Sequence, residues 1–139
     1  MRDIEKTIGN LIDKASTSFI SSIDGEGYPN TKAMLRVRKR EGIKCCYFST
    51  NTSSVRVDQY LANPKACVYF YDGRFFRGVM LIGEMEVLQD PQAKKSLWQL
   101  GDERYYPLGV EDPDYCVLRF TAKKGRYYAN FKSEDFVVD

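Results

Sequence analysis

Residues 44–63, KCCYFSTNTSSVRVDQYLAN, carry the features that decide how this chain folds. An apolar run at the start of the stretch predicts a strand, and six polar residues, Ser49 to Ser54, follow it. The stretch then continues as a predicted helix, with Ser53 as the expected N-cap and Arg56 in the first turn. The positive end of a helix dipole disfavours a cation by roughly 0.3–1 kcal/mol, so Arg56 needs an anionic partner there. The hydroxyl groups, the helix end and the cation together predict a pocket for an anion such as a phosphate.

The same stretch also has an interpretation without a ligand. Ser, Thr and Asn commonly form solvated turns, and the side chain of Arg56 would then point to water. The predicted helix places Val57, Tyr60 and Leu61 on its apolar side, where they would pack on a sheet in either case. The two interpretations therefore predict one fold and differ in whether the polar groups bind anything.

The composition indicates a globular chain, and we expect one domain over residues 1–139. Hydrophobic residues make up 43% and aromatic residues 14% of the sequence. The net charge is +2 with both signs mixed along the chain, so neither a nucleic-acid partner nor a membrane partner is expected. No apolar run reaches spanning length, and the charged amphipathic start is unlike a signal peptide, which predicts a cytoplasmic protein.

Cysteine and histidine usage limits the possible chemistry. The four cysteines include no Cys-x-x-Cys pair and are expected to be reduced, and no metal site is predicted. The chain has no histidine, which excludes a Ser-His-Asp or Cys-His nucleophile and a His-ligated zinc or haem. If the protein is an enzyme, a bound organic cofactor has to carry the chemistry, and no catalytic residue can be named.

The hydrophobic pattern predicts a mainly β protein with peripheral helices. Apolar residues at helical spacing predict a first helix over 4–15, and Asp90 with Pro91 predicts the start of another over 92–100, with Ala93, Leu97 and Leu100 as its apolar stripe. The predicted strands cover 18–23, 31–38, 43–48, 66–71, 75–89, 115–121 and 126–131. Tight turns between them, including one at Lys124-Gly125, imply antiparallel pairing, and we expect a six- to seven-stranded antiparallel barrel.

Three motifs of the chain resemble the pyridoxamine 5'-phosphate oxidase-like FMN-binding split-barrel superfamily, and together they span about residues 17 to 90. They are Gly27-Tyr28-Pro29 leading into Lys32-Ala33-Met34-Leu35, then Tyr47-Phe48-Ser49-Thr50 followed by Ser54-Val55-Arg56 and Asn63-Pro64, and finally the long strand from Arg77 to Glu86. The resemblance implies a split barrel of the FMN-binding type. It also implies a homodimer with the flavin at the subunit interface.

The resemblance assigns cofactor-binding roles to eight residues. Lys32, Thr50, Ser54 and Arg56 match positions that hold the FMN phosphate, and Ala33, Met34, Leu35 and Ser49 match positions beside the isoalloxazine ring. Trp98, Tyr105 and Tyr106 are further candidates, for the wall on the substrate side. The chain departs from the oxidase at Val55, where a second basic residue is usual, at Gly78, where a glutamine is usual, and in lacking the Arg-x-His region. The resemblance is therefore to short members similar to general stress proteins, and pyridoxamine phosphate is not the expected substrate.

The function implied by the resemblance is that of an FMN-dependent oxidoreductase acting on an unidentified small molecule. Three alternatives stay open at this point: a flavin-binding or stress-response protein without turnover, a reductase that uses the deazaflavin F420, and a barrel without a cofactor that binds another ligand.

Overall fold

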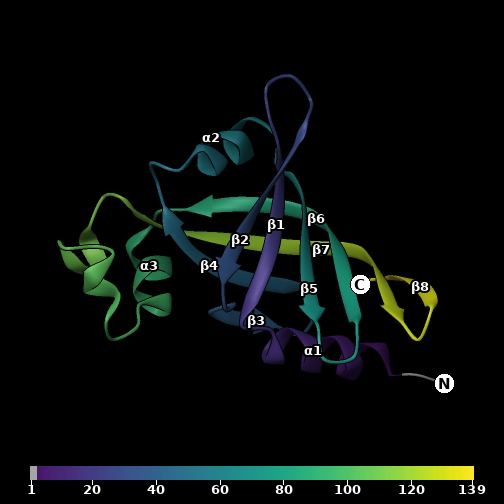
Figure 1. The fold of residues 1–139 in the computed structure, drawn as a ribbon. Coiled ribbons are helices and arrows are strands. Elements are labelled where there is room, and N and C mark those ends of the chain that lie inside the picture. The colour runs from purple at the N-terminus through teal and green to yellow at the C-terminus, as the bar shows by residue number, and fades with distance from the viewer. Residues whose placement is uncertain (1–2) are drawn as a thin grey trace.

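The computed structural model describes residues 3–139, and all its strands belong to one antiparallel sheet (Figure 1). The elements, in chain order, are α1 (Ile4–Lys14), β1 (Thr17–Ile23), β2 (Pro29–Leu35), β3 (Lys39–Glu41), β4 (Cys45–Asn51), α2 (Val55–Ala62), β5 (Lys65–Asp72), β6 (Arg77–Leu88), α3 (Pro91–Leu97), the 3-10 helices η1 (Asp102–Arg104) and η2 (Gly109–Glu111), β7 (Tyr115–Ala129) and β8 (Lys132–Val137). The predicted mainly β class with peripheral helices is confirmed, with eight described strands in place of the expected six or seven.

The sheet runs in the order β2-β1-β5-β6-β7-β4-β3, and β8 pairs with β7. The long strand β7 pairs with β6 along one edge, while its other edge is shared by β4 in the first half and β8 in the second. In Figure 1, β1 and β2 run steeply across β6 and β7, so the sheet curls back over itself. The chain therefore forms a barrel whose two end strands, β2 and β3, do not pair with each other.

One hydrophobic core fills the inside of this curled sheet. Its members come from both halves of the sheet and include Ile20, Phe48, Phe70, Leu81 and Phe120, each at most 1% exposed. They alternate with outward-facing residues along their strands, as expected for a sheet with one buried face. Burial of these large side chains provides the main stabilisation of the barrel.

The helices cover the open ends of the sheet. Figure 1 shows α1 beneath the barrel, α2 above it, and α3 with the two 3-10 helices to one side. Asp3 caps α1 by accepting a hydrogen bond from the Lys6 amide, and Asp90 caps α3 through the Ala93 amide, as the sequence predicts for Asp90. No helix within residues 3–139 is long and apolar enough to cross a lipid bilayer.

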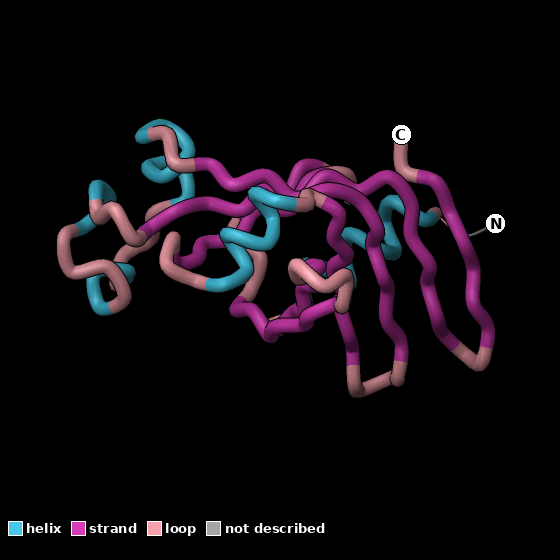
Figure 2. The backbone as a smooth tube through the Cα atoms, turned by 90° about the horizontal axis from the view of Figure 1, so that it is seen from above, coloured by secondary structure: helices cyan, strands magenta, loops and turns pink. Residues whose placement is uncertain are grey.

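The end of the chain differs from the prediction of two strands around Lys124-Gly125. Residues 115–129 form one uninterrupted strand, and the turn comes later, at Asn130 and Phe131, which both have positive φ. Figure 2 shows the resulting hairpin, which leads to the C-terminus, standing out from the rest of the sheet. Gly125 lies inside this strand, and glycine is needed there because a Cβ would come within 2.5 Å of the Phe136 ring. This glycine permits a close approach and does not mark a turn.

Smaller corrections concern strand and helix bounds. The strand predicted over 31–38 covers Pro29–Leu35, and Leu61 and Leu100, predicted on apolar helix faces, are exposed. Leu100 follows the end of α3 at Leu97, and for that reason it does not share that helix's buried side. Val57, Tyr60 and Leu97 are buried as predicted.

Candidate functional site

The split in the barrel lies between two strand edges without a neighbouring strand. No described strand pairs with the outer edge of β2, and β3 covers only the first three residues of β4, leaving the edge of residues 48–51 free. A cavity of about 440 Å³ lies between these edges. Its lining consists of Thr17, Lys32, Ala33, Met34, Leu35, Arg36, Arg38, Phe48, Ser49, Thr50, Asn51, Arg56, Tyr105 and Tyr106. Free edges present unpaired N–H and C=O groups, so the walls can form hydrogen bonds with a flat polar ligand.

Seven of the eight residues predicted as cofactor-binding line this one cavity. They are Lys32, Ala33, Met34, Leu35, Ser49, Thr50 and Arg56. The eighth, Ser54, is the N-cap of α2, directly before the first turn that holds Arg56. The fold thus brings a stretch of β2 and the end of β4, about 15 to 20 residues apart in sequence, to opposite sides of one space.

One end of the cavity is suited to a phosphate. The Arg56 guanidinium donates from Nη2 to Thr50 Oγ1 over 3.3 Å, and Lys32 lines the same space from β2. Thr50 is buried because it follows Cys46 and Phe48 on the inward side of β4. Two cations and a hydroxyl group therefore line one cavity beside the start of α2, an arrangement that suits a dianion.

The N-cap of α2 is Ser54, not the predicted Ser53. Ser53 instead donates its backbone N–H to Asp114 Oδ1 over 2.8 Å, and Asn51 donates from its side-chain amide to Asp114 Oδ2, also over 2.8 Å. These two donors lower the pKa of the Asp114 carboxyl, and Asn51 has the larger effect. The hydroxyl of Thr52 donates to the Pro113 carbonyl. The interpretation of the polar cluster as a simple turn is therefore right for Asn51, Thr52 and Ser53, which bind the loop at Pro113 and Asp114.

The remaining residues of the cluster keep buried polar atoms without a hydrogen-bond partner. Within the described chain, these atoms include Ser49 Oγ, Ser54 Oγ and Arg56 Nε. Burial raises the pKa of the neighbouring Tyr115 phenol, and the Ser49 side chain opposes that shift only in part. Ser54 makes no side-chain cap bond to the helix. A buried group without a partner is costly, so these atoms indicate a site built to bind a polar ligand.

Another part of the cavity is aromatic, and it contains two of the three residues predicted for the wall on the substrate side. Tyr105 and Tyr106 line the cavity, while Trp98 lies behind them, packing on Tyr106 at 6.1 Å and on Tyr115 at 5.3 Å between ring centroids. Burial raises the pKa of Tyr106 to about 12, so its hydroxyl stays protonated and can donate a hydrogen bond. Arg38, which the sequence did not single out as a site residue, also lines this part of the cavity.

The charge of the cavity favours an anion. Four basic residues and no acidic residue line it, and one of the four, Arg38, is paired with Asp102. Among residues 3–139, no group of three or more His, Cys, Asp or Glu side chains is placed to hold a metal ion. The residues present fit a ligand with a phosphate at one end and a flat, partly polar body along the two strand edges.

This geometry defines the class of the molecule as a split β-barrel with a ligand site in its split. The chain belongs to the pyridoxamine 5'-phosphate oxidase family, because the model of that family matches residues 4–129. The predicted resemblance is thereby confirmed. No curated protein matches the chain.

Solved structures agree with this assignment. A protein related to general stress protein 26 from Clostridium acetobutylicum, of the pyridoxinephosphate oxidase family, is 40% identical with a TM-score of 0.88, over 97% of this chain and 94% of that chain. General stress protein 26 from Bacillus anthracis is 18% identical with a TM-score of 0.80, over 99% and 100%. A pyridoxamine 5'-phosphate oxidase-related, FMN binding protein from Nostoc punctiforme is 13% identical with a TM-score of 0.75, over 100% and 98%. The last two likenesses concern the fold alone.

Proposed function

We propose that this protein binds FMN in the split of the barrel and works as a flavin-dependent oxidoreductase on a small molecule. The observation that carries the proposal is the set of unpartnered buried polar atoms of Ser54 and Arg56, beside Thr50, at one end of a cavity with two free strand edges. The name of the Nostoc punctiforme protein, which shares the fold, supports FMN as the ligand.

The phosphate of FMN would be held by Arg56, Lys32, Thr50 and Ser54. Each of these groups donates hydrogen bonds or carries a positive charge, and Arg56 already lies within reach of Thr50. At the start of α2, the first-turn amides lack intrahelical partners, which favours an anion further.

The ring system would lie along the main chain of residues 33–35, with Ser49 opposite. The outer edge of β2 offers backbone donors and acceptors there, and Met34 is the one residue of β2 whose side chain is buried beneath them. A flavin, when bound, supplies acceptance and donation of hydride. The residues of the chain position the ring, exclude water from one side of it, and offer the protonated Tyr106 hydroxyl as a hydrogen-bond donor.

We further propose that the protein is a homodimer whose interface closes the mouth of the cavity. The outward side of β2, β1 and β5 carries an apolar row of Ala33, Phe19 and Tyr69 across the strands, with the exposed Leu35 next to it on β2. Leu35 and Ala33 also line the cavity, so the apolar face continues into its mouth. A second copy covering this face would bury exposed aromatic rings and shield the flavin.

We place the protein in the cytoplasm. All four cysteines are free, and burial raises the pKa of Cys46 to about 12 and also raises that of Cys116. Reduced cysteines are usual where glutathione and thioredoxin keep thiols reduced.

Titration of the protein with FMN, riboflavin and F420 tests the choice of cofactor. We expect FMN to bind more tightly than riboflavin by at least about tenfold, because riboflavin lacks the phosphate that Arg56 and Lys32 would bind. Equal affinity for FMN and riboflavin would contradict the proposed phosphate site. Tighter binding of F420 than of FMN would make F420 the cofactor in place of FMN. Reoxidation of the reduced holoprotein by electron acceptors, compared with free FMN, then separates an oxidoreductase from a protein that only binds flavin.

A further inference from the structure

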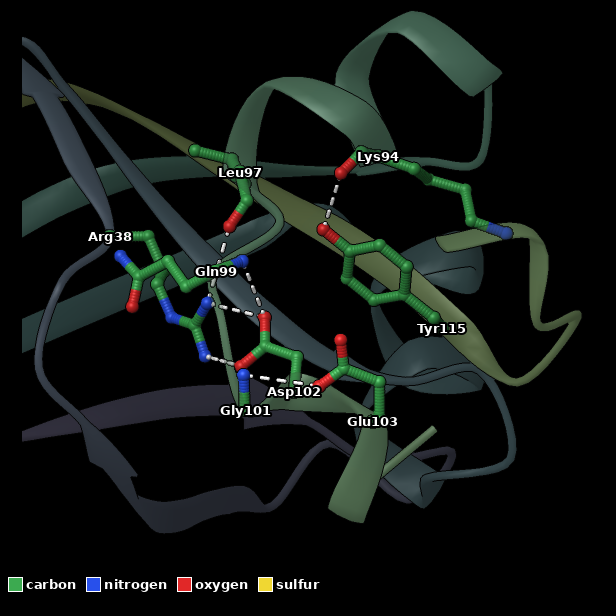
Figure 3. A network of polar contacts seen from close by, with 8 residues as sticks. All are labelled: Arg38, Lys94, Leu97, Gln99, Gly101, Asp102, Glu103 and Tyr115. Carbon is green, nitrogen blue, oxygen red and sulfur yellow. Dashed lines mark hydrogen bonds and ion pairs between the residues drawn. The ribbon is translucent and has the colours of Figure 1, made fainter. Parts of the chain in front are cut away.

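An ion pair joins the connection between β2 and β3 to the first 3-10 helix, η1. Arg38 donates to both carboxylate oxygens of Asp102, from Nη1 over 2.8 Å and from Nη2 over 2.9 Å, and also to the Leu97 carbonyl over 3.2 Å (Figure 3). The two side chains are only 13% and 5% exposed. Planar, two-point contacts of this kind fix orientation as well as distance.

Asp102 also organises the segment that carries it. Its Oδ2 accepts the Gln99 amide over 2.9 Å, and its carbonyl accepts the amides of Tyr105 and Tyr106 over 2.9 and 3.0 Å. Figure 3 shows Arg38 and Gln99 gathered around the Asp102 carboxylate, between α3 and the following loop. Residues 98–114 contain only two single-turn 3-10 helices, so this segment has little regular structure of its own to hold it in place.

The segment held in this way carries the aromatic end of the cavity. Tyr106 is 4% exposed and packs on Tyr115 at 4.9 Å between ring centroids, while Tyr105 is 48% exposed and also lines the cavity. Arg38 binds the segment that carries these two tyrosines, whereas Arg56 binds Thr50 at the end of β4. We call the two parts of the cavity that these cations hold the aromatic end and the phosphate end.

We propose that Arg38 and Asp102 are positioning residues, which hold Tyr105 and Tyr106 as the wall that recognises the ring end of the bound flavin. This inference rests on the proposed function and adds to it a division of labour between two ends of the site. The pair fits this role because an ion pair taken out of water contributes little net stability, while its geometry restricts the attached segment to one arrangement. The wall then favours flat aromatic ligands over ligands with a phosphate alone.

The test measures dissociation constants of three ligands, FMN, riboflavin and inorganic phosphate, for the wild-type protein and a double variant. The double variant is Arg38→Gln with Asp102→Asn, which removes both charges, so that neither remains buried without its partner. Arg119→Gln with Glu86→Gln is the matched control, because that pair is also two-point but bridges β7 and β6 away from the cavity lining.

The double variant should bind FMN and riboflavin about tenfold more weakly than the wild type and leave the affinity for inorganic phosphate within about twofold. Arg56→Ala should show the opposite pattern, with weaker FMN and phosphate binding and unchanged riboflavin binding. Quenching of Trp98 fluorescence by acrylamide should rise in the double variant only, because Trp98 packs against Tyr106 and is the sole tryptophan.

If the double variant is too unstable to study, Tyr105→Ala replaces it, because this half-exposed side chain can be removed without opening the core. Tyr105→Ala should give the same selective loss of flavin affinity. Unchanged flavin affinities in both variants would overturn the inference, and so would an equal loss for all three ligands. A wild-type protein that binds neither flavin overturns the proposed function as well, so the two failures can be told apart.

Discussion

Arg56 and Thr50 meet at the end of β4, where the guanidinium Nη2 lies 3.3 Å from the threonine hydroxyl oxygen, and Arg56 Nε is buried without a partner among the described residues. A guanidinium has five donors in a fixed plane, and a single long bond to a hydroxyl leaves most of them unused. The contact therefore orients Arg56 toward the cavity but leaves most of its hydrogen-bond donors unused. A bound phosphate would accept hydrogen bonds from these donors.

The first prediction concerns this residue. Replacement of Arg56 by alanine should weaken FMN binding by roughly 1.5–3 kcal/mol, the range for a hydrogen bond to a charged group, and leave the fold intact. Fluorescence titration of FMN measures the affinity, and thermal unfolding of the apoprotein checks the fold. Arg74→Ala is the control, since Arg74 lies in the turn after β5 and does not line this cavity. An unchanged dissociation constant would show that Arg56 does not hold the phosphate.

Lys32 should contribute less than Arg56, because its side chain is exposed and water and salt screen it. Replacement of Lys32 by glutamine should weaken FMN binding by less than about 1 kcal/mol and make the affinity less dependent on salt concentration. The measurement is the FMN dissociation constant at several sodium chloride concentrations. A salt dependence identical to that of the wild type would place Lys32 outside the site.

The apolar face of the sheet leads to a prediction about assembly. Phe19→Asp puts a charge in the middle of the outward row formed with Ala33 and Tyr69 and should convert the proposed dimer to a monomer. FMN affinity should fall by at least about tenfold, because the mouth of the cavity is then open to water. Analytical ultracentrifugation measures the assembly, and Leu100→Asp, at a fully exposed position in the loop after α3, serves as control. A wild-type protein that sediments as a monomer would contradict the dimer directly.

The Arg38–Asp102 pair makes stability depend on pH. The hydrogen bond from Arg38 lowers the pKa of the Asp102 carboxyl below its ordinary value of about 3.9, so the unfolded chain takes up a proton at higher pH than the folded one. The stabilisation is present above that ordinary value and is lost as pH falls toward the lower native pKa. Urea unfolding between about pH 3 and 7 should therefore show a steeper acid loss for the wild type than for the Arg38→Gln, Asp102→Asn double variant. If the free energy of unfolding falls equally with pH in both proteins, the pair does not make stability depend on the protonation of Asp102.

The fold followed well from local patterns where each strand or helix carries its own signal. Asp90 and Pro91 marked the start of α3, and the strands predicted over 18–23, 43–48 and 66–71 overlap β1, β4 and β5. The prediction failed at Gly125, since a glycine needed for close contact with a neighbouring strand looks the same in sequence as one that makes a turn. The true turn at Asn130 and Phe131 holds a bulky residue at positive φ, which sequence preferences disfavour.

The two ends of the site differ in how far the sequence could predict them. The residues of the phosphate end lie in two short stretches, and a helix start with a misplaced cation, Arg56, is a local signal. The aromatic end depends on Arg38 and Asp102, which are 64 residues apart, and no periodicity or motif joins them. The sequence offered Tyr105 and Tyr106, with Trp98, as candidates for the substrate-side wall, but it gave no sign of the tertiary contact that places them at the cavity.

The most direct test of the central claim is the absorption spectrum of the purified protein, together with the identity of any compound released on denaturation. We expect the two visible and near-ultraviolet bands of an oxidised flavin, either as purified or after addition of FMN, with one FMN recovered per chain. A colourless protein that takes up no added FMN would rule out the proposed flavin site.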